Sequence, residues 1–279
     1  MRHTLPTLTL TVLALMGSLW AGPSTLAAED VSAGFTHFES HNPSSTLTLD
    51  HSPWNAILQK YVSTDSTGLN RFAYGAVDDG DYDRLDEYLD TLQEVPIARY
   101  ARDEQMAFWI NLYNALTLQV ILDHMPVETI TAIQIDGTNP WDAAIAEVDG
   151  VELTLNDIEH RILRPIWQDP RIHYGVNCAS IGCPNLARDA FTAENLDLLL
   201  DTNAHGFVNH PRGVRFEGGP EDGERLIVSS IYIWFGEDFG DGTEGLIEHL
   251  CQYAEKDLAE RLAAYGGDVD HDYDWRLNR

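Results

Sequence analysis

The chain has 279 residues, which is long enough to bury a substantial core without disulfide support, and its hydrophobic fraction of 44% and charged fraction of 22% are those of an ordinary globular protein. Its formal net charge is −28, with Lys60 and Lys256 as the only lysines, so no basic patch can neutralise phosphates and we expect neither nucleic acid nor anionic lipid as a partner. An acidic, lysine-poor surface that stays hydrated at high ionic strength explains this charge better than a specific cationic partner does.

The N-terminus predicts a secretory signal peptide over residues 1–28. Arg2 precedes an apolar run at 8–20, and small residues follow as far as a cleavage point near Ala27 or Ala28. The run is shorter than the roughly 20 apolar residues that a membrane-spanning helix needs. We therefore expect an exported protein, periplasmic or extracellular, with no membrane span after the signal is cleaved.

A polar arm is predicted at residues 29–52, with Phe35 and Phe38 docking onto the domain that follows at 53–265. The longest helix of this domain is apolar on every side, which predicts a buried central helix. In the first half of the domain, the sequence predicts helices at 54–62, 85–92 and 103–122 and an acidic loop at 78–83.

The second half begins with a hairpin at 145–154, because Asp149-Gly150 is a favoured two-residue turn between strands. The pattern as a whole predicts an α+β fold, a mostly helical single domain with short antiparallel strands in hairpins. In this half, the sequence predicts helices at 155–163, 193–208 and 245–264, a second hairpin with strands at 214–217 and 226–229, and an acidic tail at 266–279.

Two asparagines lie within the buried central helix. Asn111 and Asn114 are three residues apart and so share a face. Buried amides are costly unless they find hydrogen-bond partners. They either clamp neighbouring loops or line a site, where they would orient an imidazole or bind a carbonyl.

The predicted helix at 155–163 carries a second motif. His160 and Arg164 lie one turn apart, and Glu159 lies beside the apolar stripe. An unperturbed pKa near 6.5 makes histidine the usual general base at neutral pH. The alternative is an ordinary surface helix stabilised by ion pairs.

The third motif contains a candidate nucleophile. Residues 172–176 alternate weakly and predict a strand, which would place Cys178 accessibly at its end, where a neighbouring imidazole favours the thiolate. Along such a strand His173 is about 16 Å from Cys178, at roughly 3.3 Å per residue. His160 is therefore the better candidate for the base.

The same cysteine has other possible roles. Cys178 could form a disulfide with Cys183, or either of them could pair with Cys251, since an exported protein meets oxidising conditions. A redox dithiol is a third possibility, although the spacing is not Cys-x-x-Cys.

Metal and cofactor motifs are not found in this sequence. It contains neither a His-Glu-x-x-His nor a paired Cys-x-x-Cys motif, and it has no Gly-rich nucleotide loop or Gly-x-Ser-x-Gly elbow. We expect no metal and no cofactor.

Five segments, taken in this order, resemble the DUF547 family, a domain of unknown function found in bacteria, plants and nematodes. The likeness spans about residues 54–255. Some family members are joined to redox or regulatory domains, which indicates thiol or interaction roles. The segments are AFWINLYNALTLQVIL, LTLNDIEHRILRP, DPRIHYGVNCASIGCPNL, FTAENLDLLLDTNAHGFVN and VSSIYIWFGEDFG. By motif, the resemblance points to Asn111, Asn114, Glu159, His160, Arg164, His173 and Cys178.

The leading hypothesis is a thiol-dependent hydrolase or transferase acting on an acyl or peptide bond. Cys178 would be the nucleophile and His160 its base. Glu159 or Asn111 would orient the imidazole, and Asn114 would help to hold a developing oxyanion.

Whether the protein is an enzyme is left open at this point. One alternative is a non-catalytic module that binds an unknown small molecule or protein, with a structural disulfide and with asparagines that are structural. Apart from the catalytic set, Asn114, Arg164 and His173 are the candidate binding residues. The other is a thiol–disulfide protein, whose disulfide would have a potential above that of inert structural bridges.

Overall fold

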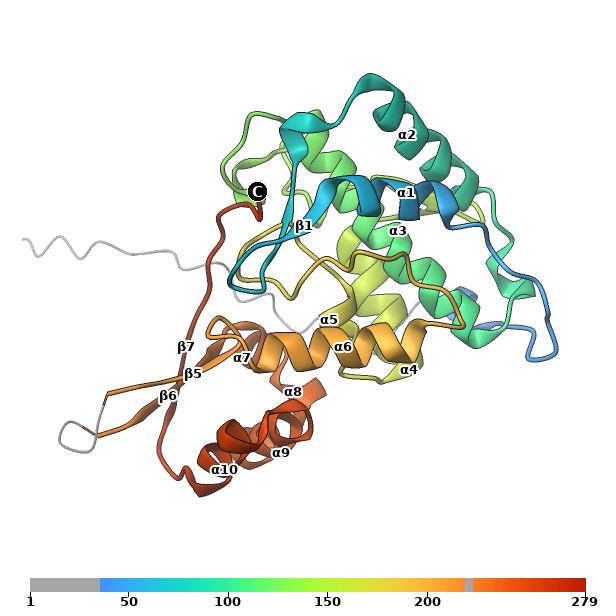
Figure 1. The fold of residues 1–279 in the computed structure, drawn as a ribbon. Helices are drawn as coiled ribbons and strands as arrows, with labels where there is room; N and C mark the ends of the chain where they lie inside the picture. The colour runs from blue at the N-terminus through green and yellow to red at the C-terminus, as the bar shows by residue number, and fades with distance from the viewer. Residues whose placement is uncertain (1–35, 219–222) are drawn as a thin grey trace, which may run out of the picture. The chain divides into compact units, whose positions relative to one another are not determined.

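A computed structural model describes residues 36–218 and 223–279, which belong to one compact unit (Figure 1). The expected signal peptide, Phe35 and the beginning of the arm lie outside the described residues. The described part combines helices with three small sheets, so the predicted α+β class is confirmed. None of its helices is long and apolar enough to cross a membrane.

The predicted central helix forms α3 (Arg102–Asp123), and nearly all of its side chains are buried. The neighbouring helix α2 (Asp79–Gln93) packs on it. The N-terminus of α2 is capped by Asp78, whose carboxylate accepts a hydrogen bond from the Asp81 N–H at 3.0 Å. The acidic loop predicted at 78–83 is therefore the start of a helix, because the first carboxylate satisfies its free N–H groups.

The arm docks onto the domain as expected. Phe38 is buried and meets the ring of Trp109 edge-on, with ring centroids 5.0 Å apart.

The first predicted hairpin is confirmed. Strands β3 (Ala146–Val148) and β4 (Val151–Leu153) pair antiparallel. Asp149 and Gly150 both have positive φ angles, of 51° and 76°. Positive φ angles at both central residues are typical of the type I′ turn, which joins the two strands of a tight hairpin.

The second hairpin is also confirmed, and it gains a third strand. β5 (Val214–Glu217) pairs antiparallel with β6 (Arg225–Ser229), which pairs on its other edge, in parallel, with β7 (Val269–Asp272). The prediction of an acidic tail at 266–279 is wrong. This segment satisfies its backbone groups on β6 and then buries Leu277 in the core.

The long helix predicted at 245–264 is two helices, α9 (Gly242–Tyr253) and α10 (Lys256–Ala264). The backbone is extended at Ala254 and Glu255, and the two helices pack against each other.

The segments that carry Glu159, His160, Arg164 and His173 are helical, whereas Cys178 lies in a loop. The predicted helix at 155–163 is a π-helix, η5 (Asp157–Leu163), and continues as α4 (Arg164–Trp167). The strand predicted at 172–176 is instead the helical turn α5 (Ile172–Gly175). Every residue of α5 is buried, so the weak alternation in its sequence does not reflect one buried and one exposed face.

Hydrophobic side chains form two core clusters. The first surrounds α3, and the second fills the space between β5, β6 and α9. The turn α5 lies where they meet, because Ile172 belongs to the first cluster and Tyr174 to the second. Candidate residues near α5 are therefore held by both cores.

The remaining elements include the pair β1–β2, an antiparallel sheet that the sequence did not predict. They are α1 (Ser52–Tyr61), β1 (Val62–Thr64), β2 (Asn70–Phe72), α6 (Leu196–Val208), α7 (Ile231–Trp234), α8 (Gly236–Phe239), and the 3-10 helices η1 (Thr36–Glu39), η2 (Tyr74–Ala76), η3 (Ile97–Arg99) and η4 (Ile130–Ala132).

Candidate functional site

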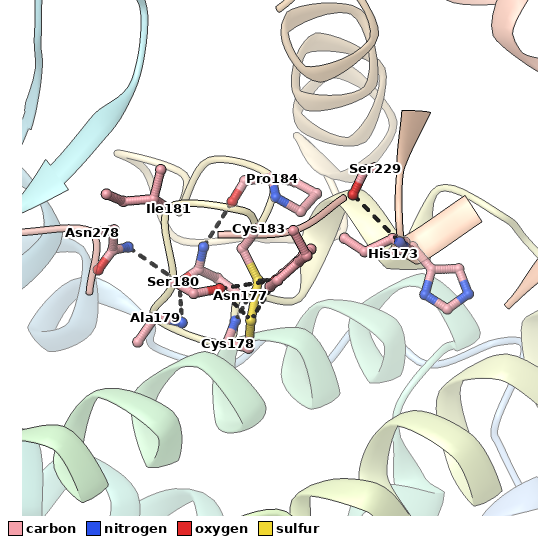
Figure 2. Close-up of a disulfide and its surroundings, with 12 residues drawn as sticks. His173, Asn177, Cys178, Ala179, Ser180, Ile181, Cys183, Pro184, Ser229 and Asn278 are labelled. Carbon is pink, nitrogen blue, oxygen red and sulfur yellow. Dashed lines mark hydrogen bonds between the residues drawn. A yellow bond between two sulfur atoms is a disulfide. The ribbon is translucent and has the colours of Figure 1, made fainter. Parts of the chain in front are cut away.

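Cys178 and Cys183 form a disulfide, with their Cα atoms 6.3 Å apart (Figure 2). This distance is within the range that a disulfide spans. The free nucleophilic thiol expected at Cys178 is therefore not what this structure contains, because its sulfur is already bonded. Cys251 is the free cysteine of the described residues.

Hydroxyl and amide groups surround the two sulfur atoms. The Cys178 Sγ lies 3.0 Å from the Tyr273 hydroxyl and 3.1 Å from the Ser180 hydroxyl. The Cys183 Sγ accepts the Cys178 N–H at 3.0 Å and the Tyr273 O–H at 3.2 Å. Within the described chain, no imidazole is among the hydrogen-bond partners of either sulfur. The sulfurs therefore lie among donors that would stabilise negative charge, with no base beside them.

Buried amides hold the loop that contains the disulfide. The Asn114 side chain accepts from the Asn177 N–H at 2.8 Å and donates to the Gly175 carbonyl at 2.9 Å. The Asn177 amide in turn donates to the Pro184 carbonyl at 2.7 Å and accepts from the Ala179 N–H at 2.9 Å. Asn114 is thus a clamp, and the role expected for it, holding an oxyanion, has no geometric support here.

The C-terminal segment holds the other side of this loop. The Ile181 N–H donates to the Arg276 carbonyl and the Gly182 N–H to the Asp274 carbonyl, both at 2.8 Å. A side chain at Gly182 would clash with the Tyr273 ring, because an added Cβ would lie 2.9 Å from it. The close packing of Gly182 therefore keeps the tyrosine hydroxyl on the sulfurs.

A second cluster is centred on His173. This imidazole is almost fully buried, and its Nε2 lies 2.6 Å from Asp238 Oδ2. Its Nδ1 lies 3.4 Å from Glu159 Oε1. The Phe235 ring stacks on the imidazole, with centroids 4.7 Å apart and planes 12° from parallel.

The charges of this cluster stabilise one another. Burial would lower the pKa of His173, but its hydrogen bonds to Asp238 and Glu159 outweigh burial and raise it. Burial would likewise raise the pKa of each carboxyl group, yet the pKa of Glu159 falls to about 2, mainly through the charges of His160 and His173, and that of Asp238 falls to about 2 through His173 and Arg164. We infer an imidazolium between two carboxylates.

His160 and Arg164 lie beside this cluster. Arg164 Nε donates to Asp238 Oδ2 at 2.5 Å, Nη2 donates to Glu237 at 2.9 Å, and Nη1 lies 3.3 Å from His160 Nδ1. Burial lowers the pKa of His160, with Glu159 opposing this and Arg164 adding to it. A neutral His160 fits the protonation state of a base, but its contacts are with this ion cluster and not with a sulfur.

Asn111 is placed differently from the expectation. Its amide donates to the Phe191 carbonyl at 2.7 Å and accepts from the Phe191 N–H at 3.0 Å. It clamps the segment that precedes α6, and it does not orient an imidazole.

Two cavities open at the His173 cluster. One, of about 300 Å³, is lined by Arg164, Glu237 and Asp238 among others, and the second, of about 490 Å³, includes Asp238 and His249. Pro170 and Asp238 line both. Asp238 thus connects the buried imidazole to solvent.

The structure brings the predicted residues into two groups instead of one. Glu159, His160, Arg164 and His173 converge, whereas Cys178 lies in the disulfide loop. In Figure 2 the His173 ring points away from the sulfur atoms. The buried Tyr113 hydroxyl interacts with Glu159 of the His173 cluster, and burial together with that carboxylate raises the pKa of Tyr113.

Several residues of these groups were missed from the sequence. Asp238 lies in a segment that resembles the family, but nothing local indicates that it reaches His173, 65 positions away. Tyr273 fell within the supposed tail. No group of three or more His, Cys, Asp and Glu side chains in the described part of the chain is arranged to hold a metal ion.

Comparison with known proteins finds a family match in the central part of the chain. Residues 97–208 match the family model DUF547, described as a protein of unknown function. The match includes Asn111, Glu159, His173 and Cys178, and it leaves out Tyr273. No curated protein and no solved structure matches the chain.

Proposed function

Because the DUF547 model that residues 97–208 match is described without an activity, we propose a function from the geometry: the protein exchanges disulfides with thiol-bearing partners through Cys178 and Cys183. One observation carries this proposal. The half-buried Cys178 sulfur and the buried Cys183 sulfur are surrounded by the Tyr273 hydroxyl, the Ser180 hydroxyl and a backbone N–H.

The order of the exchange follows from Cys178 being less buried than Cys183. A partner thiolate attacks Cys178 Sγ, the bond to Cys183 breaks, and the electron pair leaves on Cys183 Sγ, where the Cys178 N–H and the Tyr273 O–H stabilise it. A second partner thiolate then attacks the partner sulfur of the mixed disulfide and expels the Cys178 thiolate. Two electrons pass from a partner dithiol to this protein, and the partner leaves as a disulfide. Of the two protons that the dithiol loses, Cys178 takes up one and solvent takes the other.

The loop is suited to both redox states. Asn114, Asn177 and the C-terminal segment hold its backbone by hydrogen bonds that do not involve the sulfurs. We therefore expect the loop to keep its conformation when the S–S bond is reduced. This distinguishes it from a disulfide that keeps a loop in place.

The hypothesis of acyl or peptide-bond transfer has less support. It needs a reduced Cys178 with His160 as its base, and His160 Nδ1 instead lies beside Arg164 and Glu159. The non-catalytic binding module remains the alternative if the disulfide cannot be reduced in the folded protein.

We also propose that the protein is exported, since the N-terminal pattern and a disulfide both fit an oxidising compartment. The intact mass of the protein secreted by its native producer tests this. Export with cleavage predicts a mature chain that starts at residue 28 or 29, and a chain retaining Met1 contradicts it.

The exchange is tested by equilibrating the folded protein with glutathione redox buffers and counting alkylated thiols by mass spectrometry. We expect reversible reduction of the folded chain at a potential above about −300 mV, the level below which structural disulfides lie. Cys183→Ser should form a mixed disulfide with glutathione at Cys178, Cys178→Ser should react much more slowly, and Cys251→Ser is the matched control. Reduction that occurs only on unfolding would falsify the proposal.

A further inference from the structure

Arg212 donates to the disulfide loop and has no counter-ion among the residues that the structure describes. Its Nη1 donates to the Ile181 carbonyl at 3.1 Å, and its Nη2 donates to Asn185 Oδ1 at 2.6 Å. The guanidinium lies over the Phe207 ring, 5.3 Å from the centroid. Ile181 is one of the four residues between the two cysteines, so this cation lies against the ring that the disulfide closes.

The charge of Arg212 is not balanced within the described residues. Its Nε is buried without a hydrogen-bond partner, and no carboxylate there lies within ion-pair distance of it. Asp65 is the carboxylate whose charge acts on it, and Asp65 Oδ2 already pairs with Arg71 Nε at 3.0 Å. Burial lowers the pKa of Arg212 to about 10, but the side chain stays charged at neutral pH. An unpaired cation in a partly buried position is costly unless an anion lies near it.

We propose that Arg212, from its contact with the disulfide loop, stabilises the reduced form of the pair, in which Cys183 is a thiolate. Reduction adds two electrons: Cys178 takes up a proton when its thiolate leaves the partner, and Cys183 remains a thiolate. The Tyr273 hydroxyl, whose charge state Arg212 influences, donates to that sulfur. This inference rests on the proposed disulfide exchange and names the residues that set its potential.

Tyr273 is the residue whose hydroxyl touches the reacting sulfurs. Arg212 acts on them through Tyr273 and the loop peptides, so it is a positioning residue. Stabilising the reduced form makes a disulfide more oxidising. The pair would therefore accept electrons readily from partner dithiols. A cation placed near a thiol also favours its thiolate.

The test compares Arg212→Met, Arg212→Lys and Tyr273→Phe with Arg225→Met, a matched control whose side chain is exposed and lies far from the sulfurs in sequence. Two quantities are measured on the folded proteins: the equilibrium constant for reduction in glutathione buffers, and the thiol pKa from thiolate absorbance. Arg212→Met should reduce the equilibrium constant about tenfold, about 30 mV, and raise the thiol pKa by about one unit. Tyr273→Phe should shift both the same way, and Arg212→Lys should retain most of the original values.

The outcomes separate the two proposals. If the unsubstituted protein is not reduced while folded, disulfide exchange fails and this inference with it. If it is reduced but Arg212→Met matches Arg225→Met, exchange stands and the role of Arg212 is wrong. If Arg212→Met does not fold, the other two variants decide. The inference is overturned if Tyr273→Phe leaves the thiol pKa unchanged and Arg212→Lys fails to retain the original equilibrium constant for reduction.

Discussion

Single buried amides do much of the positioning in this protein. Asn111 and Asn114 each use both ends of the side chain, accepting from a backbone N–H and donating to a backbone carbonyl of a distant segment. A peptide-like group that makes two such bonds recovers the free energy lost when it leaves water. The two asparagines therefore hold the segments on which the site is built.

Replacing Asn111 by alanine should cost about 3 kcal/mol in the free energy of unfolding, because the N–H and the carbonyl of Phe191 would both stay buried without partners. Urea denaturation measures this change. Asn42→Ala is the control, since Asn42 is exposed and its side chain bonds to Ser44 nearby. Equal losses in the two variants would contradict the clamping role.

Asp238→Asn should lower the pKa of His173, because the hydrogen bond to Asp238 is the largest of the influences that raise it. Histidine NMR titration measures the pKa directly. Glu237→Gln serves as control, since Glu237 is largely exposed and contacts Arg164 instead of the imidazole. An unchanged pKa in Asp238→Asn would mean that the two groups are not coupled as described.

Among the elements, the disulfide loop stands out because it is held from two directions. The central helix α3 holds it through Asn114, and the segment after β7 holds it through Gly182 and Ile181. Ala179 even adopts a left-handed backbone, with φ of 61°, and is kept there by bonds to Asn177 and Asn278. A loop so fully held does not need a covalent cross-link.

The double variant Cys178→Ser/Cys183→Ser should therefore fold and lose only about 2 kcal/mol, the chain-entropy value for a loop this short. Urea denaturation gives the loss, and circular dichroism checks the fold. Cys251→Ser shows the effect of a cysteine outside the loop. A double variant that fails to fold would show that the S–S bond, and not the hydrogen bonds, holds this segment.

At the scale of the whole molecule, a net charge of −28 makes self-repulsion the dominant long-range force. Salt screens it, with a Debye length of about 3 Å at 1 M against about 10 Å at 0.1 M. Local ion pairs such as those of Asp238 are less affected, because they are partly buried. Salt should therefore raise the stability of the fold overall.

Stability should fall as the pH is lowered from 6.5 to about 4. Burial lowers the pKa of His51 to about 4, and burial together with the charge of His173 lowers that of His249 to about 4. The unfolded chain thus takes up protons in this window that the folded chain refuses, at up to about 1.4 kcal/mol per pH unit for each group. His173 has a raised pKa and the opposite sign, so its contribution is complete below pH 6.5 and is lost at higher pH.

The loss continues below pH 4.5, where Glu159 and Asp238, whose pKa values are about 2, must also be protonated. Urea denaturation in 1 M salt measures both stages with self-repulsion screened. His249→Gln should make the slope between pH 6.5 and 4 shallower, and His205→Gln, an exposed position, should not. A slope that His249→Gln leaves unaltered would rule out His249 as its source.

The sequence alone was sufficient for features that adjacent residues encode. The all-round apolar run determined α3, and Asp149-Gly150 determined the β3–β4 hairpin, because periodicity and turn geometry act over a few residues. The same local signals failed at α5, where every side chain is buried and alternation carries no information.

Only the tertiary structure decided which distant groups meet. His173 and Asp238 are 65 positions apart, and Cys178 and Tyr273 are 95 apart, while β7 joins β6 across four intervening helices. Such contacts depend on how two hydrophobic cores pack around α5, and no run of neighbouring residues specifies that packing. The sequence therefore determined which residues could do chemistry, and packing determined that the cysteine has a sulfur and a tyrosine for neighbours instead of an imidazole.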